Sequence, residues 1–225
     1  SIVSSYPMGI KSKLLNWQDR TTCVLFGDGA GAAILEIVVT DSDFGIRSSV
    51  LHADGAYRDI LYVDGGPSSN QDVGFVRMEG KEVFRHAIEK LATVMDEALA
   101  KANMQPQDID WLVPHQANIR IINAVGSKLG VDPKKTIVTI DKYGNTSAAS
   151  IPISLCEALK NDMIRGGETI LIASFGAGLS CGAAVVKWGD ATKNIRDTAF
   201  SIPAYQGEVH NLLEDSFSYH GISYN

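Results

Sequence analysis

The sequence predicts an α/β fold, in which a sheet containing parallel strands lies between layers of helices. Short apolar runs alternate along residues 1–189 with longer segments whose apolar side chains recur every three or four positions, as they do on one face of a helix. The runs also lack the alternation of apolar and polar residues that marks a strand with one face in water, and Thr169–Ile172 is an example. Strands buried on both faces are typical of sheets that helices cover on either side.

The first part of the chain is expected to form strands rather than helices. It contains four apolar runs separated by residues that favour turns. The runs are Thr22–Phe26, Ala32–Val39, Gly45–Ala53 and Val73–Met78. The segment 64–72 is rich in Gly, Pro, Ser and Asn, and we expect it to be a loop.

From residue 81 onward, helices and strands are expected to alternate. The clearest helix is Lys81–Asn103, because its apolar residues fall at spacings of three and four and form one stripe. Two further helices are expected at Asn118–Leu129 and Ala148–Asn161. The strands are expected at Ile109–Val113, Thr136–Ile140, Thr169–Ser174 and Gly182–Trp188.

The composition argues against several classes of protein. The 225 residues carry a net charge of −6 without a long basic run, which argues against nucleic-acid binding. No apolar stretch approaches the roughly 20 residues of a membrane span. The 3 cysteines lack CxxC spacing, and the 5 histidines form neither HxxxH nor HExxH. We therefore expect reduced thiols, a cytoplasmic protein and no metal site.

The two ends of the sequence differ from the body. The chain begins with Ser1 rather than Met, and we expect it to start inside a longer protein. Residues 190–225 hold 5 acidic and 2 basic residues, and therefore half of the net charge of −6, without a helical or strand period. We expect a loosely ordered, appended tail there.

Three polar or glycine-rich clusters follow strands, where α/β sheets bind ligands. His115 comes directly after the strand that ends at Pro114, which is compatible with catalysis or with a hydrogen-bonded structural role. Asn145 lies in DKYGNTSAAS, where its amide can donate to a ligand or cap a helix. The turn at 175–180 can present backbone N–H groups to an oxyanion or simply reverse the chain.

A fourth cluster, FGDGAGA at residues 26–32, has the glycine content of a phosphate-binding loop. Such a loop must open a helix, whereas the residues that follow here have the pattern of a strand. We therefore reject a dinucleotide site at this position.

The order of the motifs is more specific than any one of them. Residues 1–188 resemble the later part of β-ketoacyl-acyl-carrier-protein synthase III, a condensing enzyme of the thiolase superfamily. The matching stretches are FGDGAGAAIL (26–35), LHADG (51–55), MEGKEVFRHAIEKL (78–91), WLVPHQANIRII (111–122), DKYGNTSAAS (141–150) and SFGAGLSCGAA (174–184).

The resemblance implies a thiolase-like α/β fold, made of two similar βαβαβαββ halves stacked in five layers. On this basis we expect residues 1–60 to hold the last strands of the N-terminal half and residues 73–189 to form the C-terminal half. Residues 190–225 match neither half and are expected to be an atypical tail. Members of the family form homodimers, so we expect a homodimer of the complete protein.

The resemblance also implies an acyltransferase that starts fatty-acid synthesis. Such an enzyme takes an acyl group from acyl-CoA onto a cysteine and condenses it with malonyl-acyl carrier protein in a decarboxylative Claisen reaction, without a cofactor. His115 and Asn145 match the family's catalytic pair, which donates hydrogen bonds to the malonyl thioester oxygen as negative charge develops. The backbone N–H of Ala177 matches one side of the oxyanion hole.

Further residues match the binding sites of the family. For CoA and its pantetheine arm these are Arg20, Gly80, Phe84, Ala117 and Asn118. For docking of the acidic carrier protein they are Arg120 and, as weaker candidates, Arg85 and Lys128. Charged residues on a helix face are commonly only solvated, and this alternative stays open for Arg85 and Lys128.

One departure from the family concerns the nucleophile. The family's cysteine lies in a motif of the N-terminal half that precedes the residues of this sequence. Cys23, Cys156 and Cys181 are each expected to be a buried small apolar residue instead. We therefore expect this chain alone to be inactive. Two alternatives stay open, namely a non-catalytic remnant that binds CoA or a partner, and a related polyketide-type condensing enzyme.

Overall fold

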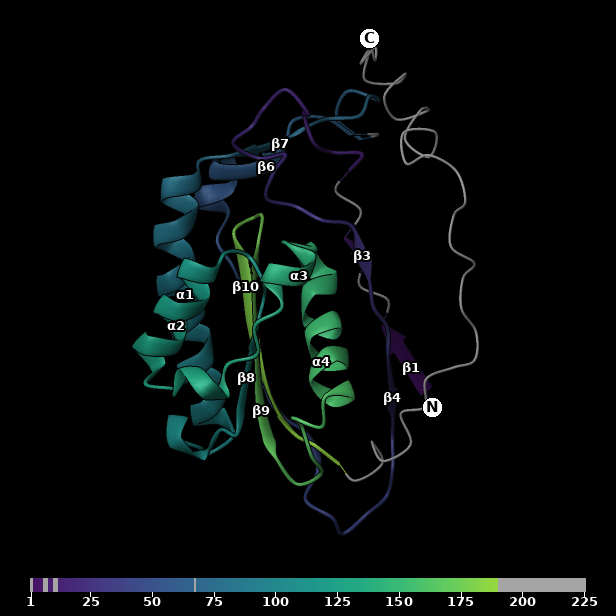
Figure 1. The fold of residues 1–225 in the computed structure, drawn as a ribbon, viewed down its shortest axis with the longest axis vertical. Helices are drawn as coiled ribbons and strands as arrows, with labels where there is room; N and C mark the ends of the chain where they lie inside the picture. Colours follow the sequence, from purple (N-terminus) through teal and green to yellow (C-terminus); the bar gives the residue numbers. More distant parts are fainter. Residues whose placement is uncertain (1, 6–7, 10–11, 67, 190–225) are drawn as a thin grey trace. The chain divides into compact units, whose positions relative to one another are not determined.

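The computed structural model describes residues 2–5, 8–9, 12–66 and 68–189 (Figure 1). The tail expected at 190–225 lies outside these residues. The principal sheet has the strand order β5 (Gly45–Ala53), β10 (Ser180–Lys187), β9 (Thr169–Gly176) and β8 (Trp111–Pro114). β8 and β9 run parallel, whereas β10 is antiparallel to both β9 and β5. β5, β8 and β9 therefore point the same way.

Helices cover both faces of this sheet (Figure 1). α1 (Gly80–Lys101) and α2 (Ile119–Leu129) lie on one face, and α4 (Ser150–Lys160) lies on the other. α3 (Ile140–Tyr143) is a short turn of helix before α4. The predicted α/β fold with a covered sheet is confirmed. Within the described ranges, no helix is long and apolar enough to cross a bilayer.

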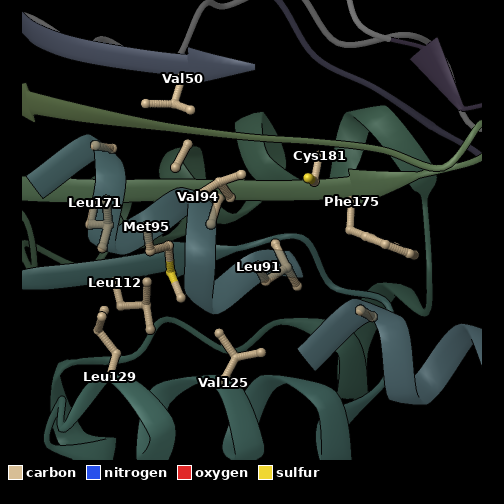
Figure 2. Close-up of a cluster of buried hydrophobic side chains, with 14 of the residues drawn as sticks. Val50, Leu91, Val94, Met95, Leu112, Val125, Leu129, Leu171, Phe175 and Cys181 are labelled. Atoms are coloured by element: carbon tan, nitrogen blue, oxygen red, sulfur yellow. The ribbon is translucent and has the colours of Figure 1, made fainter. Parts of the chain in front are cut away.

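Two apolar clusters hold the helices on the sheet. The larger one joins α1 and α2 to the sheet, and it includes Met95, Val125 and Leu171 (Figure 2). The smaller one packs Ala158 of α4 against Ile170 on the opposite face. Because full burial of a large aliphatic side chain contributes about 1.5–3 kcal/mol, these clusters rather than helix propensity determine the layers.

Local sequence determines where α2 begins and ends. Asn118 is its N-cap, and Asn118 Oδ1 accepts a hydrogen bond from Arg120 N at 2.8 Å. Gly130 follows the last residue of α2 with a φ of +75°, a left-handed conformation that glycine adopts without steric cost. The helix expected at Asn118–Leu129 is confirmed within one residue.

Among the described residues, three two-stranded ladders accompany the principal sheet. β1 (Ile2–Ser5) pairs with β4 (Ala33–Glu36), β2 (Met8–Gly9) with β3 (Gly29–Ala30), and β6 (Leu61–Val63) with β7 (Val76–Met78). All three ladders are antiparallel. Short 3₁₀ helices occur at Gly55–Ile60, Pro106–Asp108, Pro133–Lys135 and Ser147–Ala149.

The strand expected at Thr22–Phe26 is wrong, apart from a single bridge between Phe26 and Asn145. The residues form turns instead, because the Asp19 carboxylate accepts hydrogen bonds from Thr21 N and Thr22 Oγ1, both at 2.9 Å. An aspartate that bonds the backbone two residues ahead starts a turn regardless of the apolar residues that follow. Thr21 Oγ1 also donates to Asp19 Oδ1 at 2.6 Å, and this hydrogen bond is the main reason why the pKa of Asp19 is lowered, with smaller contributions from Thr21 N and Thr22 Oγ1.

The strand expected at Thr136–Ile140 is also wrong, apart from a bridge between Leu112 and Thr136. Ile137 N donates to Leu112 O at 2.9 Å, but the next rung of this parallel ladder would need an N–H at Pro114. Proline has no N–H to donate. Gln116 Nε2 donates to Ile137 O instead, at 3.2 Å, and the ladder ends there.

The principal sheet draws on both of the expected domains. β5 lies within residues 1–60, yet it forms the edge strand beside β10. From β5 onward the chain runs through α1, β8, α2, the bridge at Thr136, α4, β9 and β10, which is a βαβαβαββ order. The expected boundaries at residues 60, 73 and 189 themselves stay predictions.

Candidate active site

Several of the expected site residues lie at one edge of the principal sheet. Because β5, β8 and β9 point the same way, their carboxyl ends meet at that edge, which is where α/β sheets bind ligands. His115 follows β8, the turn that contains Ala177 follows β9, and Asp54 follows β5. The topology thus brings His115 and the Ala177 turn to the same edge.

His115 is half-buried and is held through its backbone and its side chain. Its N–H donates to Ala173 O at 2.7 Å, which extends the ladder between β8 and β9 by one rung. Its Nδ1 lies 2.7 Å from Ser150 Oγ at the start of α4. The same oxygen accepts a hydrogen bond from Gln116 N at 3.2 Å. One hydroxyl therefore connects both the imidazole and the following peptide to α4.

Gln116 is a site-supporting residue that sequence reasoning missed. Its side chain is 1% exposed, and its amide makes hydrogen bonds in two directions. Nε2 donates to Pro114 O at 2.8 Å and to Ile137 O, while Oε1 accepts from Thr139 N at 2.9 Å and from Ile140 N at 3.2 Å. Gln116 thus joins the end of β8 to the segment that leads to Asn145. The signal for this role in the sequence was a polar residue two positions after the end of a buried strand.

Asn145 is 8% exposed, and its backbone is held between two residues of the 25–27 segment. Asn145 N donates to Leu25 O at 3.1 Å, and Asn145 O accepts from Gly27 N at 3.0 Å. Its Oδ1 accepts from Ser147 N at 2.9 Å. The side-chain oxygen therefore serves the local turn, as the capping alternative expected, and Nδ2 is the half of the amide that can donate to a ligand.

The glycine-rich segment 27–31 packs against the Asn145 loop and the first turn of α4. A Cβ atom at Gly27 would lie 2.5 Å from Tyr143 O, and one at Gly31 would lie 2.5 Å from Pro152 Cγ. At Gly29, it would lie 2.9 Å from Ile153 Cδ1. Side chains are excluded here because the two segments approach closely, which accounts for the glycines without a phosphate ligand.

The turn that contains Ala177 is braced by β5 and α1. Leu179 N donates to Asp54 O at 2.9 Å, and Asp54 N donates to Leu179 O at 2.7 Å. The Asp54 carboxylate in turn pairs with Lys90 Nζ of α1 at 2.6 Å. This hydrogen bond from Lys90 is the main reason why the pKa of Asp54 is lowered, and it raises the pKa of Lys90. Ala177 itself is exposed, so its N–H lies in a held turn at the surface.

The N-terminal ends of α1 and α2 bring together most of the expected binding residues. The Arg120 guanidinium lies over the Phe84 ring, 5.1 Å from its centroid. Gly80 and Arg85 flank Phe84 on α1, and Ala117 and Asn118 precede Arg120 at the start of α2. Asn118 Oδ1 caps α2, so this residue has a structural role in addition to the expected one.

Three expected residues lie apart from this group or are engaged elsewhere. Arg20 is exposed in the turns that follow Asp19. Lys128 occupies the last turn of α2, eight residues beyond Arg120 and therefore about 12 Å away along the helix axis. Arg85 pairs with Glu82 at 2.7 Å, and this hydrogen bond raises the pKa of Arg85.

The cysteines differ from one another in exposure. Cys181 is buried in β10, and burial raises the pKa of its thiol. Cys23 is half-buried and Cys156 is exposed on α4, so the expectation of a buried cysteine is confirmed for Cys181 alone of the three and is wrong for Cys156. Cys156 points away from the smaller cluster because α4 buries only one side of its surface. In the described part of the chain, no group of three or more His, Cys, Asp and Glu side chains could hold a metal ion.

Comparison with known proteins identifies relatives along the same residues. Residues 99–188 match the family profile described as 3-oxoacyl-[acyl-carrier-protein] synthase III C terminal, and residues 8–55 match the profile described as 3-oxoacyl-[acyl-carrier-protein] synthase III. The β-ketoacyl-[acyl-carrier-protein] synthase III of Rhodospirillum centenum is 52% identical over 179 residues, covering 79% of this chain and 55% of the relative. That of Dinoroseobacter shibae is 52% identical over 180 residues, covering 79% and 56%. The chain thus spans a little over half the length of these curated relatives.

Solved structures match the fold. The synthase III of Thermus thermophilus has a TM-score of 0.77 and 43% identity, covering 84% of this chain and 60% of that one. The enzyme of Aquifex aeolicus has a TM-score of 0.77 and 39% identity, covering 83% and 58%. The priming β-ketosynthase of the R1128 polyketide pathway has a TM-score of 0.75 and 33% identity, covering 84% and 57%. From the motifs, the profiles and the thiolase-like fold together, we conclude that the chain belongs to the β-ketoacyl-acyl-carrier-protein synthase III family, of which it contains the C-terminal portion.

Proposed function

We propose that the chain contains the decarboxylation part of a synthase III active site. In the complete protein, His115 and Asn145 donate hydrogen bonds to the thioester oxygen of malonyl-acyl carrier protein while CO₂ leaves. The observation that carries this proposal is that both residues are connected to the start of α4. His115 Nδ1 contacts Ser150, the first residue of α4, and Asn145 lies five residues before Ser150 in the loop that enters this helix.

The course of decarboxylation explains why two neutral hydrogen-bond donors, His115 and Asn145, suit this site. The electron pair of the breaking C–CO₂ bond moves into the thioester, so that negative charge develops on the thioester oxygen. Donors that are oriented before the charge develops stabilise the transition state more than the ground state. Asn145 Oδ1 is engaged by Ser147 N, which leaves the Nδ2 donor for this task.

We propose further that the Ala177 N–H forms one side of an oxyanion hole for acyl transfer. The bracing of its turn by Asp54 and Lys90 supports this role, because an oxyanion donor has to be held in place before the reaction. The turn and His115 share a sheet edge, so the acyl thioester at the Ala177 N–H and the malonyl thioester at His115 would be bound at the same edge of the sheet.

The substrates proposed are acyl-CoA and malonyl-acyl carrier protein, without a cofactor. The pantetheine arm would lie along the N-terminal ends of α1 and α2, near Phe84, Ala117 and Asn118. Arg120 is the favoured contact for the acidic carrier protein, because Arg85 is already paired with Glu82 and Lys128 lies at the other end of α2. Roles for Gly80 and Arg20 in CoA binding, a homodimer and a cytoplasmic location complete the proposal.

Two other functions compete with this one. Priming of polyketide synthesis is favoured by the likeness to the R1128 priming ketosynthase, and would differ in the acyl primer. A non-catalytic remnant is favoured by the cysteines, since Cys181 is buried and Cys156 lies on the surface of α4. Once a nucleophilic cysteine is supplied, the remnant predicts no catalysis, whereas the polyketide-type enzyme predicts a different preference among acyl primers.

The decisive experiment supplies that cysteine. Residues 1–189 would be joined to the N-terminal segment of the Rhodospirillum centenum relative, and two steps measured, namely transfer of labelled acetyl from acetyl-CoA to protein and release of CO₂ from malonyl-acyl carrier protein. We expect His115→Ala to lower CO₂ release by about 10²- to 10³-fold, the usual effect of losing one such donor. Acetyl transfer is expected to stay within a few-fold.

His52→Ala is the matched control, because His52 is an exposed histidine that pairs with Glu97 on the surface. It should leave both steps unchanged. Equal loss of both steps in His115→Ala would mean that His115 also activates the nucleophile. A chimera that binds CoA but neither loads acetyl nor releases CO₂ would favour the remnant.

A further inference from the structure

We propose that Ser150 is a positioning residue that holds the neutral imidazole of His115 in the tautomer with its proton on Nε2. That the Nε2 proton is donated to a substrate rests on the proposed function. That the proton is on Nε2 rather than Nδ1 rests only on the hydrogen bonds around Ser150. No role for Ser150 follows from the motifs considered one by one.

Ser150 occupies a buried position between two elements. It is the first residue of α4 and is 2% exposed. In the part of the chain that the structure describes, two polar groups contact its Oγ, namely Gln116 N at 3.2 Å and His115 Nδ1 at 2.7 Å. Both belong to the segment that leaves β8, so Ser150 faces the end of this strand from α4.

The protons around Ser150 can be assigned from these two contacts. A peptide N–H is always a donor, so Ser150 Oγ accepts the hydrogen bond from Gln116 N. The hydroxyl proton then needs an acceptor of its own, because a buried O–H without a partner is unfavourable. His115 Nδ1 is that acceptor, and at 2.7 Å the contact has the length of a good O–H donor bond.

This assignment determines the tautomer of His115. In a neutral imidazole, one nitrogen carries the proton and the other accepts. If Nδ1 accepts from Ser150, the proton resides on Nε2. That tautomer can donate to a thioester oxygen, whereas the other would present a lone pair to the developing negative charge. Ser150 thereby selects, from the two neutral tautomers of His115, the one whose Nε2–H can donate a hydrogen bond.

The test reads the protonation of each ring nitrogen directly. NMR of the 225-residue chain with ¹⁵N-labelled histidine, at about pH 8 and therefore above the ordinary histidine pKa of about 6.5, separates protonated from bare nitrogens. His115→Gln identifies the His115 signals among those of the 5 histidines. We expect a protonated Nε2 and a bare Nδ1 that accepts a hydrogen bond. A proton on Nδ1 would overturn the proposal.

Two serine variants separate positioning from general support of α4. Ser150→Ala should remove the hydrogen-bond shift of the Nδ1 signal and allow the second tautomer to appear. Ser154→Ala is the matched control, because Ser154 is also buried on α4, one turn later, and contacts Thr139 Oγ1 at 2.8 Å rather than His115. It should leave the His115 signals unchanged.

Unchanged His115 signals in Ser150→Ala, or equal changes in Ser154→Ala, would also overturn the proposal. If Ser150→Ala does not fold, the same measurement is made on Ser150→Cys. The same change in the His115 signals is expected, since a thiol of similar shape is only a weak donor and acceptor. None of these readouts depends on activity. A chimera without CO₂ release would therefore contradict the proposed function and leave the tautomer assignment intact.

Discussion

At the scale of single residues, the position of Asn145 depends on a glycine that packs against its loop. Its backbone is bonded to Leu25 and Gly27, and this close approach is possible because Gly27 has no Cβ. A Cβ there would lie 2.5 Å from Tyr143 O, a backbone atom that cannot rotate away as a side chain would. The glycines and the catalytic candidate therefore form one structural unit, although 118 positions separate Gly27 from Asn145.

Gly27→Ala tests this dependence. We expect the free energy of unfolding to fall by about 1–3 kcal/mol, the usual cost of overpacking, as measured by the urea midpoint at unchanged slope. Gly55→Ala is the control, because a Cβ at Gly55 would meet nothing within 4 Å. Equal destabilisation by both substitutions would mean that the approach of the two segments is not what requires glycine.

At the scale of elements, one ion pair connects β5, α1 and the turn between β9 and β10. Lys90 Nζ of α1 pairs with the Asp54 carboxylate, whose backbone exchanges two hydrogen bonds with Leu179. Lys90 also lies over the Tyr57 ring, 5.0 Å from its centroid. The turn that contains the proposed oxyanion donor is thus fixed by the residue that follows β5 and, through it, by α1.

The pH dependence of stability tests this connection. The pKa of Asp54 is lowered in the folded state, mainly by the hydrogen bond from Lys90, so its contribution is complete above the ordinary carboxyl pKa of about 3.9 and is lost as pH falls through the lower folded value. The pKa of Lys90 is raised, so its contribution is complete below about 10.4 and is lost as pH rises through the higher folded value. We expect Asp54→Asn to reduce the melting temperature between these limits and to flatten the acid limb of its pH profile.

Asp59→Asn is the control for this profile, because Asp59 is an exposed carboxylate paired only with its neighbour Arg58 among the contacts described for it. It should leave the acid limb in place. An acid limb that persists unchanged in Asp54→Asn would show that other carboxylates cause it.

The elements also show which parts of the fold can be predicted from sequence. α1 and β5 were predicted within two residues at each end; for α1 the reason is the long apolar stripe, which leaves few alternatives. The strand expected at Thr22–Phe26 was wrong because of a local turn at Asp19, whose partners lie two and three residues ahead. The strand expected at Thr136–Ile140 was wrong because its partner strand ends in Pro114, and that pairing is visible only in three dimensions. At the site, the motifs indicated His115 and Asn145, but Ser150 and Gln116 act through contacts that no local pattern encodes.

At the scale of the whole molecule, the residues around 24–51 present many large apolar side chains to the surface. Val24, Ile37, Ile46 and Leu51 are among them, and Leu51 is 85% exposed. An exposed apolar surface of this kind favours association. Any measurement on the 225-residue chain therefore needs a monomeric fraction isolated by size exclusion.

On such a fraction, we expect no acyl-enzyme to form from acetyl-CoA. A nucleophilic thiol has to be accessible and stabilised as a thiolate, by a cation or a helix N-terminus. Cys181 is buried and burial raises the pKa of its thiol, Cys23 is half-buried, and Cys156 lies in the middle of α4, away from the helix N-terminus. Intact-mass spectrometry after incubation with acetyl-CoA should therefore show no gain of about 42 Da, the mass of one acetyl thioester. Iodoacetamide is the control for access, and it should alkylate the exposed Cys156 first. A stoichiometric acetyl adduct that maps to Cys23, Cys156 or Cys181 would show that the chain supplies its own nucleophile, and the proposal that the cysteine must come from outside these residues would then be wrong.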